Sequence, residues 1–82
     1  MKYLDCVEVI VEKEKYAKEG VHKGMQGVIW LEECIDGEWD VYFPQYGEHP
    51  DIAEIPIKEQ DLKPISRMDA KVNEQIKAEF GD

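Results

Sequence analysis

The sequence is poor in basic side chains, with 10 lysines and arginines against 19 aspartates and glutamates in 82 residues. The formal net charge is −9, whereas a domain that neutralises nucleic-acid phosphates needs the opposite balance. Nucleic acid is therefore an unfavoured partner. The imbalance is concentrated between residues 32 and 61, where ten acids face the single base Lys58. Such a stretch either solubilises a surface or attracts a basic partner.

Cysteines and long apolar runs are also scarce. Cys6 and Cys34 are too few for the disulfide framework of a secreted domain, and each lies in an apolar run typical of a reduced thiol. A bond between them stays open as an alternative if their strands are neighbours. No segment approaches the roughly 20 apolar residues of a membrane span, and the N-terminal segment lacks a signal-peptide cleavage site. We therefore expect a cytoplasmic protein with no membrane partner.

No motif in the sequence indicates catalysis, a metal or a cofactor. The four potential zinc ligands lie 16, 12 and 15 residues apart, whereas structural zinc sites use close pairs: Cys6, His22, Cys34 and His49. The pair Gly24 and Gly27 does not match a phosphate loop, because a predicted strand follows it instead of a helix. Nothing orients a cysteine–histidine nucleophile pair. We expect a protein that is not an enzyme.

Alternating apolar and polar residues predict five short strands, over residues 6–13, 27–33, 38–43, 52–57 and 62–65. The charged segment 14–26 is predicted to be a mostly irregular loop, pinned to the core by Tyr16 and Val21. Residues 58–61 are predicted to form a single helical turn. Pro56 lacks an N–H group, so its strand should lie at an edge or face solvent.

The segment that starts at residue 27 is expected to be a central strand, because it is apolar on both faces for four residues. The Asp36-Gly37 pair predicts a tight turn into the strand 38–43. In that strand the alternation places Trp39, Val41 and Phe43 in the core and points Tyr42 the opposite way.

The C-terminal segment changes to a helical period. Ser66 followed by Asp69 resembles a capping box, and Gly81 fits a helix stop. These signals predict an amphipathic helix over residues 66–80, whose apolar stripe recurs every four residues at Met68, Val72, Ile76 and Phe80. The stripe must be buried on the same chain or in a dimer seam. We expect docking on the same chain, and a monomer or weak dimer, because one short helix is a poor dimer interface.

Five short strands, a long first loop, a tight hairpin and a helical turn before the last strand predict a mainly β fold, a small SH3-like barrel over residues 1–65. Residues 66–82 are expected to add a helix that packs on it. An OB-like barrel is the alternative, although it is usually longer. Gly24 and Gly27 are predicted to be structural glycines at the bend that leads into the second strand.

The segment "HKGMQGVIW" resembles the lysine/arginine-x-glycine-x-x-glycine-x-valine pattern of KOW-type and other SH3-like barrels. Residues 5–65 look like a family of uncharacterised small bacterial domains, at positions that are folding motifs: Asp5, Val7, Gly24, Gly27, Val28, Val41, Phe43, Asp61, Leu62 and Pro64. The resemblance implies a barrel and no activity. KOW-type domains bind RNA or protein, but the charge of this chain departs from that of the RNA-binding members.

Exposed aromatic residues offer the best candidate for a binding surface. Tyr16, Tyr42 and Tyr46 are expected to line a shallow groove between the first loop and the hairpin loop, with Glu48 and Asp51 as an acidic rim. SH3-like barrels often bind peptides with exposed aromatics in that region. Such a rim would select basic or proline-containing ligands.

These observations lead to three functional hypotheses. The first is a non-enzymatic protein-interaction module in a bacterial cytoplasm. The second is an acidic inhibitor or immunity-type protein that imitates a polyanion and binds a basic partner. The third, which the charge disfavours, is RNA binding through the glycine bend.

Overall fold

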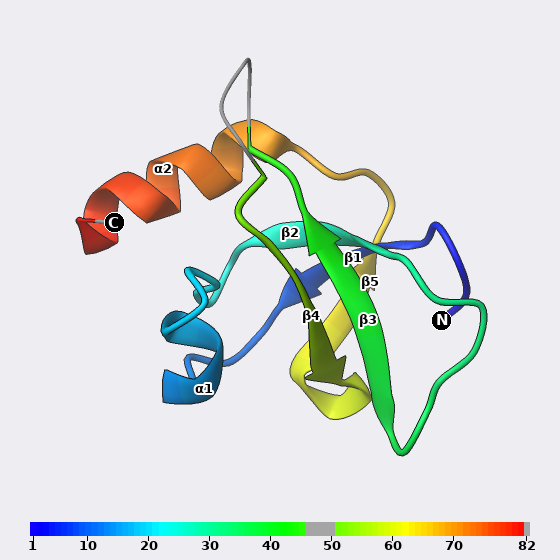
Figure 1. The fold of residues 1–82 in the computed structure, drawn as a ribbon. Coiled ribbons are helices and arrows are strands. Elements are labelled where there is room, and N and C mark those ends of the chain that lie inside the picture. The colour runs from blue at the N-terminus through cyan, green and yellow to red at the C-terminus, as the bar shows by residue number, and fades with distance from the viewer. Residues whose placement is uncertain (46–50, 82) are drawn as a thin grey trace.

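The computed structural model describes residues 1–45 and 51–81, which contain one antiparallel sheet and a C-terminal helix (Figure 1). The strands are β1 (Cys6–Val9), β2 (Gln26–Ile29), β3 (Glu38–Phe43), β4 (Ala53–Lys58) and β5 (Leu62–Ile65), in the order β4-β3-β2-β1-β5. The helical segments are α1 (Glu14–Ala17), the 3-10 turn η1 (Glu59–Asp61) and α2 (Ala70–Phe80). The predicted mainly β fold, with five short strands and a C-terminal helix, is confirmed at this level.

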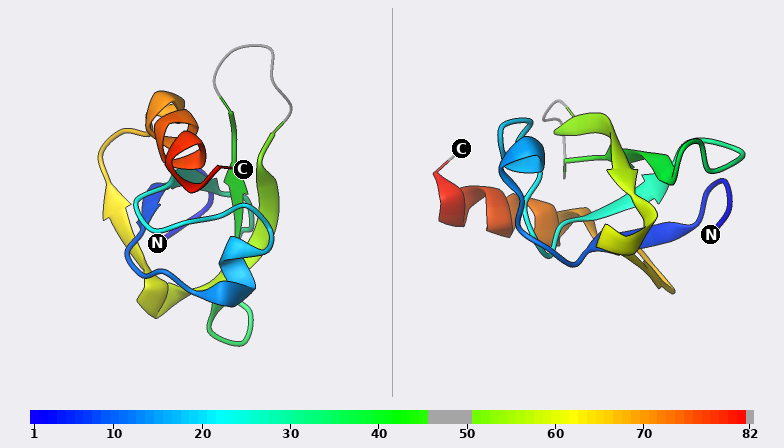
Figure 2. Two further views of the ribbon diagram at one scale, coloured as in Figure 1. Left: turned by 90° about the vertical axis from the view of Figure 1, so that its left-hand side faces the viewer. Right: turned by 90° about the horizontal axis from the view of Figure 1, so that it is seen from below.

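All five strands contribute one face to a single core, because the sheet curves until β3 and β4 lie across from β1 and β5 (Figures 1 and 2). The core residues alternate along the strands as predicted and include three from the first connection: Val7, Val9, Ile29, Trp39, Val41, Phe43, Ile57, Leu62, Tyr16, Val21 and Met25. Within residues 1–45 and 51–81, no hydrogen-bonded ladder joins β4 to β5. The edge position predicted for Pro56 is confirmed, and Pro64 lies on the opposite edge.

The segment between β2 and β3 differs from the prediction. The ladder pairs Val28 with Tyr42 and Ile29 with Val41, but the next bridge joins Ile35 to Glu38 in a register shifted by three residues. The intervening residues must therefore bulge out of the sheet, so β2 ends at Ile29 instead of residue 33. The predicted central position of this strand is confirmed. The tight turn is confirmed too, with positive φ angles of 54° at Asp36 and 78° at Gly37.

Glycine is required at the two predicted structural positions for different reasons. A Cβ atom on Gly27 would lie 2.6 Å from the Tyr42 carbonyl oxygen and 2.8 Å from Val41 Cγ1, so only glycine lets β2 and β3 approach this closely. Gly24 has a φ of 92°, which favours glycine, and its Cα faces Ile76 of α2. The bend is thus packed between the sheet and the helix.

Helix α2 starts four residues later than predicted. Its N-cap is Asp69, whose carboxylate accepts a hydrogen bond from the Lys71 N–H at 2.9 Å, and the Asp69 N–H donates to Gln26 Oε1 at 2.7 Å. Residues 66–69 instead carry the chain from β5 to the end of the sheet where α2 lies (Figure 2). The predicted stop is confirmed at Gly81, which has a φ of 74°.

Helix α2 docks on its own chain through a polar residue that the apolar stripe did not reveal. Asn73 is fully buried; its Oδ1 accepts from the Gln26 N–H at 2.7 Å, and its Nδ2 donates to the carbonyl oxygens of Gln26 at 2.7 Å and Pro44 at 3.0 Å. Ile76 packs against the core beside it, and Phe80 stacks on His22 with ring centroids 3.7 Å apart. The amide thus satisfies backbone groups at the end of β2 and after β3.

Candidate interaction surface on the outer face of the sheet

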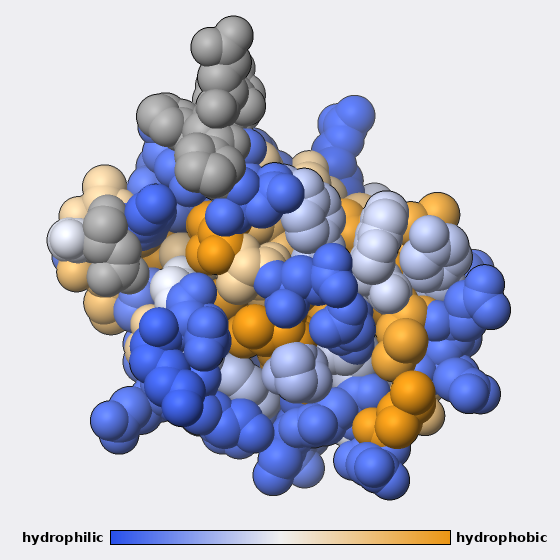
Figure 3. Space-filling view, in the orientation of Figure 1, coloured by the Kyte–Doolittle hydropathy of each residue, from blue (hydrophilic) through white to orange (hydrophobic). Residues whose placement is uncertain are grey.

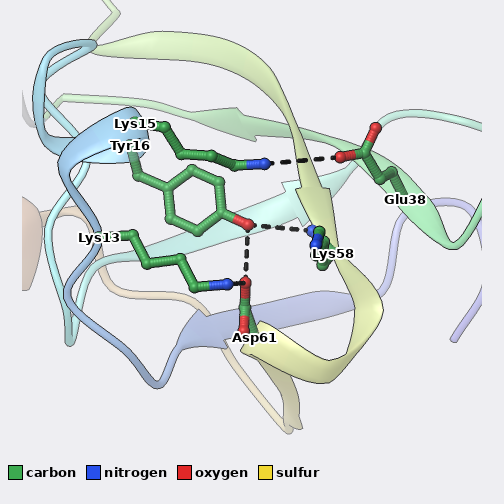
Figure 4. A network of polar contacts seen from close by, with 6 residues as sticks. All are labelled: Lys13, Lys15, Tyr16, Glu38, Lys58 and Asp61. Carbon is green, nitrogen blue, oxygen red and sulfur yellow. Dashed lines mark hydrogen bonds and ion pairs between the residues drawn. The ribbon is translucent and has the colours of Figure 1, made fainter.

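Tyr16, which the sequence placed in an exposed groove, lies in the core with 1 % of its surface exposed. Its inclusion in the binding surface is therefore wrong, whereas the prediction that it pins the first loop is confirmed. The reason is a buried polar network (Figure 4): the Tyr16 hydroxyl donates to Asp61 Oδ2 at 2.8 Å and accepts from the Lys58 N–H at 3.2 Å. These bonds let a tyrosine occupy an interior position.

The same network shifts the pKa values of Tyr16 and Asp61. Burial raises the pKa of Tyr16 to about 12, and the hydrogen bond to Asp61 adds to that effect while the one from Lys58 opposes it. Burial alone would raise the pKa of Asp61, but hydrogen bonds from Lys13, at 2.6 Å, and from Tyr16 outweigh it and lower the pKa. Asp61 is thus a buried carboxylate that holds Tyr16 of α1 against η1, while the Tyr16 hydroxyl extends the network to β4, and its role is structural.

Two of the other predicted surface residues do come together. Tyr42 points away from the core as predicted, and its hydroxyl donates to Asp51 Oδ1 at 2.6 Å. This hydrogen bond, followed by partial burial, raises the pKa of Tyr42. Tyr46 and Glu48, the remaining two, lie outside the described residues.

Tyr42 belongs to a row of three aromatic side chains on the outer face, which we call the aromatic row: Tyr3, Trp30 and Tyr42. Trp30 is in the middle, with ring centroids 5.6 Å from Tyr3 and 5.8 Å from Tyr42, both in tilted arrangements. Trp30 is 46 % exposed and Tyr3 40 %. Contiguous exposed apolar side chains often mark interaction sites, and Trp and Tyr are enriched among the residues that dominate interface energies.

The sequence did not identify Tyr3 as part of the surface. It also did not assign Trp30 to either face of the sheet, because the strand was expected to continue past residue 30. The backbone N–H of Trp30 still donates to the Asp40 carbonyl oxygen at 2.8 Å, which continues the β2–β3 ladder by one residue. The Trp30 side chain therefore follows the alternation of β2 onto the outer face. The available signal was this alternation: Ile29 is buried, so residue 30 must point outward.

Tyr3 reaches Trp30 through a turn with unusual backbone geometry. Leu4 has a φ of 72°, a left-handed conformation that costs a non-glycine residue about 1 kcal/mol, and its side chain is 54 % exposed. The turn is held by hydrogen bonds from the Leu4 N–H to the Ile29 carbonyl oxygen at 2.8 Å and from the Lys2 N–H to Asp5 Oδ2 at 3.0 Å. Strained backbone of this kind is concentrated at functional sites.

Carboxylates flank the aromatic row on both sides. On the β3–β4 side, Tyr42 pairs across the ladder with Glu54, and Glu54 is hydrogen-bonded to Asp40. This hydrogen bond between two acids, together with their mutual repulsion, raises the pKa of Glu54. We call Asp40, Asp51 and Glu54 the acidic edge.

On the other side of Trp30, the bulge between β2 and β3 forms an open depression of about 660 Å³. Apolar and acidic side chains share its lining: Tyr3, Trp30, Leu31, Glu32, Glu33 and Ile35. In Figure 3 the surface is mostly hydrophilic, with hydrophobic side chains exposed on its right, over the β2–β3 connection. The outer face therefore combines exposed apolar area with negative charge.

Three further features bear on chemistry outside the outer face: metal-ligand groups, the two cysteines and the helices. Over residues 1–45 and 51–81, no group of three or more histidine, cysteine, aspartate or glutamate side chains is placed to hold a metal ion. Cys6 and Cys34 are free thiols in the structure. None of the helices in these ranges is both long and apolar enough to cross a membrane.

Comparison with protein-family models, with curated proteins and with solved structures gave no match. The assignment of a function therefore depends on the geometry of the outer face.

Proposed function

We propose that this protein is a non-enzymatic interaction module, built on an SH3-like barrel, that binds a basic segment of a partner protein in the cytoplasm. The observation that carries the proposal is the aromatic row flanked by the acidic edge on one side and by Glu32 and Glu33 on the other. The strand order and the helical turn before β5 agree with the SH3-like arrangement.

The charge of the chain supports a basic partner. All of the net charge of −9 arises between residues 32 and 61, which include both acidic flanks of the row. A cationic partner is steered toward such a face, and exposed aromatic rings then supply contact area at low entropic cost. The acidic inhibitor hypothesis uses the same face against a folded basic protein.

RNA binding through the glycine bend has no support from this geometry. Gly27 is buried between β2 and β3, and Gly24 faces the side chain of Ile76. Both glycines of the bend are therefore explained by packing against other parts of the chain, and a role in RNA binding is not needed to account for them.

The proposal is tested by titrating the protein with a synthetic eight-residue peptide of alternating arginine and proline, monitored through the indole NMR signals. We expect saturable shifts of Trp30 and little change at Trp39, whose buried indole N–H donates to Glu59. Trp30→Ala should weaken binding at least about tenfold.

Ile10→Ala, a change at a residue of similar exposure (37 %) outside the aromatic row, is the matched control and should leave the affinity unchanged. An aspartate–proline peptide of the same length should not bind. Shifts that do not saturate, or that persist unchanged in Trp30→Ala, would contradict the proposal.

A further inference from the structure

The acidic edge and the aromatic row meet at one point on the outer face, where side chains from three strands converge. Trp30 follows β2 and is bonded through its backbone to Asp40 of β3, which pairs across the ladder with Pro56 of β4. Tyr42 lies two residues further along β3, opposite Glu54. Two rings, a proline and two hydrogen-bonded carboxyl groups thus surround one small area.

We propose that this area is a subsite for a single arginine side chain of the partner, with the guanidinium group bridging Asp40 and Glu54 and stacking against Trp30. The inference rests on the proposed function, and it names the chemistry that the surface recognises.

A guanidinium group fits this environment better than an ammonium group does. It is planar, weakly hydrated and carries five N–H donors in a rigid fork, so it can bond two carboxylates while its flat face contacts an aromatic ring. An ammonium group is compact and strongly hydrated, and it has no flat face to stack. The tilted rings of Trp30 and Tyr42, 5.8 Å apart, provide aromatic area beside the carboxylates.

Binding at this point is coupled to a proton. Asp40 and Glu54 repel each other when both are ionised, which favours a proton between them. The other charged or titratable groups on this face of β3 and β4 are Tyr42, Glu38 and Lys58, and Asp51 is hydrogen-bonded to Tyr42. An arriving guanidinium replaces the proton as the source of positive charge, and the proton leaves to solvent. The affinity should therefore rise with pH across the range in which the pair titrates, and protons should be released on binding in acidic buffer.

The test compares the arginine–proline peptide with two versions of equal length, in which citrulline or lysine replaces every arginine. Citrulline keeps the shape of arginine without its charge. We expect at least a tenfold weaker affinity for citrulline and an intermediate one for lysine. Calorimetry at acidic pH, in buffers of different ionisation enthalpy, should show proton release with the arginine peptide.

Variants of the protein test whether Asp40 and Glu54 are responsible for the arginine preference and the proton release. Asp40→Asn and Glu54→Gln should each reduce the preference for arginine over citrulline and abolish the proton release, while Glu14→Gln, an exposed acid on α1, should change neither. Equal affinity for the arginine and lysine peptides, with the citrulline peptide weaker and binding still lost in Trp30→Ala, would overturn the arginine subsite and leave the proposed binding of a basic segment intact. Absence of any Trp30-dependent binding would overturn both.

Discussion

Gly27 shows how a single missing side chain sets the distance between two strands. We predict that Gly27→Ala destabilises the protein by about 3 kcal/mol, because the new Cβ would meet a backbone oxygen of β3 at 2.6 Å and cannot be accommodated by a side-chain movement alone. The measurement is the free energy of unfolding from urea denaturation, followed by fluorescence.

Gly37→Ala is the matched control, because a Cβ there meets no atom within 4 Å. It should cost only about 1 kcal/mol, which is the cost of a positive φ angle in a residue other than glycine. Equal losses in the two variants would contradict the close approach of β2 to β3 as the reason for glycine at position 27.

At this scale, alternation predicted correctly which β3 side chains are buried, because a strand has only two faces. It could not place Tyr16, whose burial depends on Asp61, a partner 45 residues away that leaves no local signal. For Trp30 the alternation of β2 gives the correct outer face, but the strand was expected to continue to residue 33, and the end of the ladder depends on the β2–β3 register shift. The aromatic row was therefore incomplete when inferred from sequence.

At the scale of elements, α2 is attached by a polar clamp as well as by apolar contacts. We predict that Asn73→Ala lowers the free energy of unfolding by about 2 to 3 kcal/mol, because it leaves buried backbone groups of Gln26 and Pro44 without a partner. Gln75→Ala, an exposed position on the same helix, should change stability by less than about 0.5 kcal/mol. Amide hydrogen exchange should show α2 and the Gln26 N–H losing protection together in Asn73→Ala.

If protection is lost at α2 alone while Gln26 stays protected, the Asn73 side chain does not hold the end of β2.

The helix itself was predictable from its period and its glycine stop. Its first turn was not, because both Ser66 and Asp69 can cap a helix, and the choice depends on the hydrogen bond from the Asp69 N–H to Gln26, far away in sequence.

At the scale of the whole molecule, the network of Tyr16 and Asp61 ties the first connection to the end of the sheet, and it should shape the pH dependence of stability. The pKa of Asp61 is lowered in the folded state, so its contribution is present above the unfolded pKa of 3.8 and is lost as the pH falls. The pKa of Tyr16 is raised from 10.0 to about 12, so its contribution is present below pH 10 and is lost as the pH rises toward 12.

We therefore predict that Tyr16→Phe lowers the free energy of unfolding by about 1 to 2 kcal/mol at pH 7, through the loss of two buried hydrogen bonds. The difference from the unaltered protein should shrink between pH 10 and 12, because the tyrosine loses its own contribution there. Tyr3→Phe, at an exposed ring, should leave the curve almost unchanged. Urea denaturation at pH 7, 9.5 and 11.5 measures this, and parallel curves for Tyr16→Phe and the unaltered protein above pH 10 would show that the buried network tolerates the phenolate.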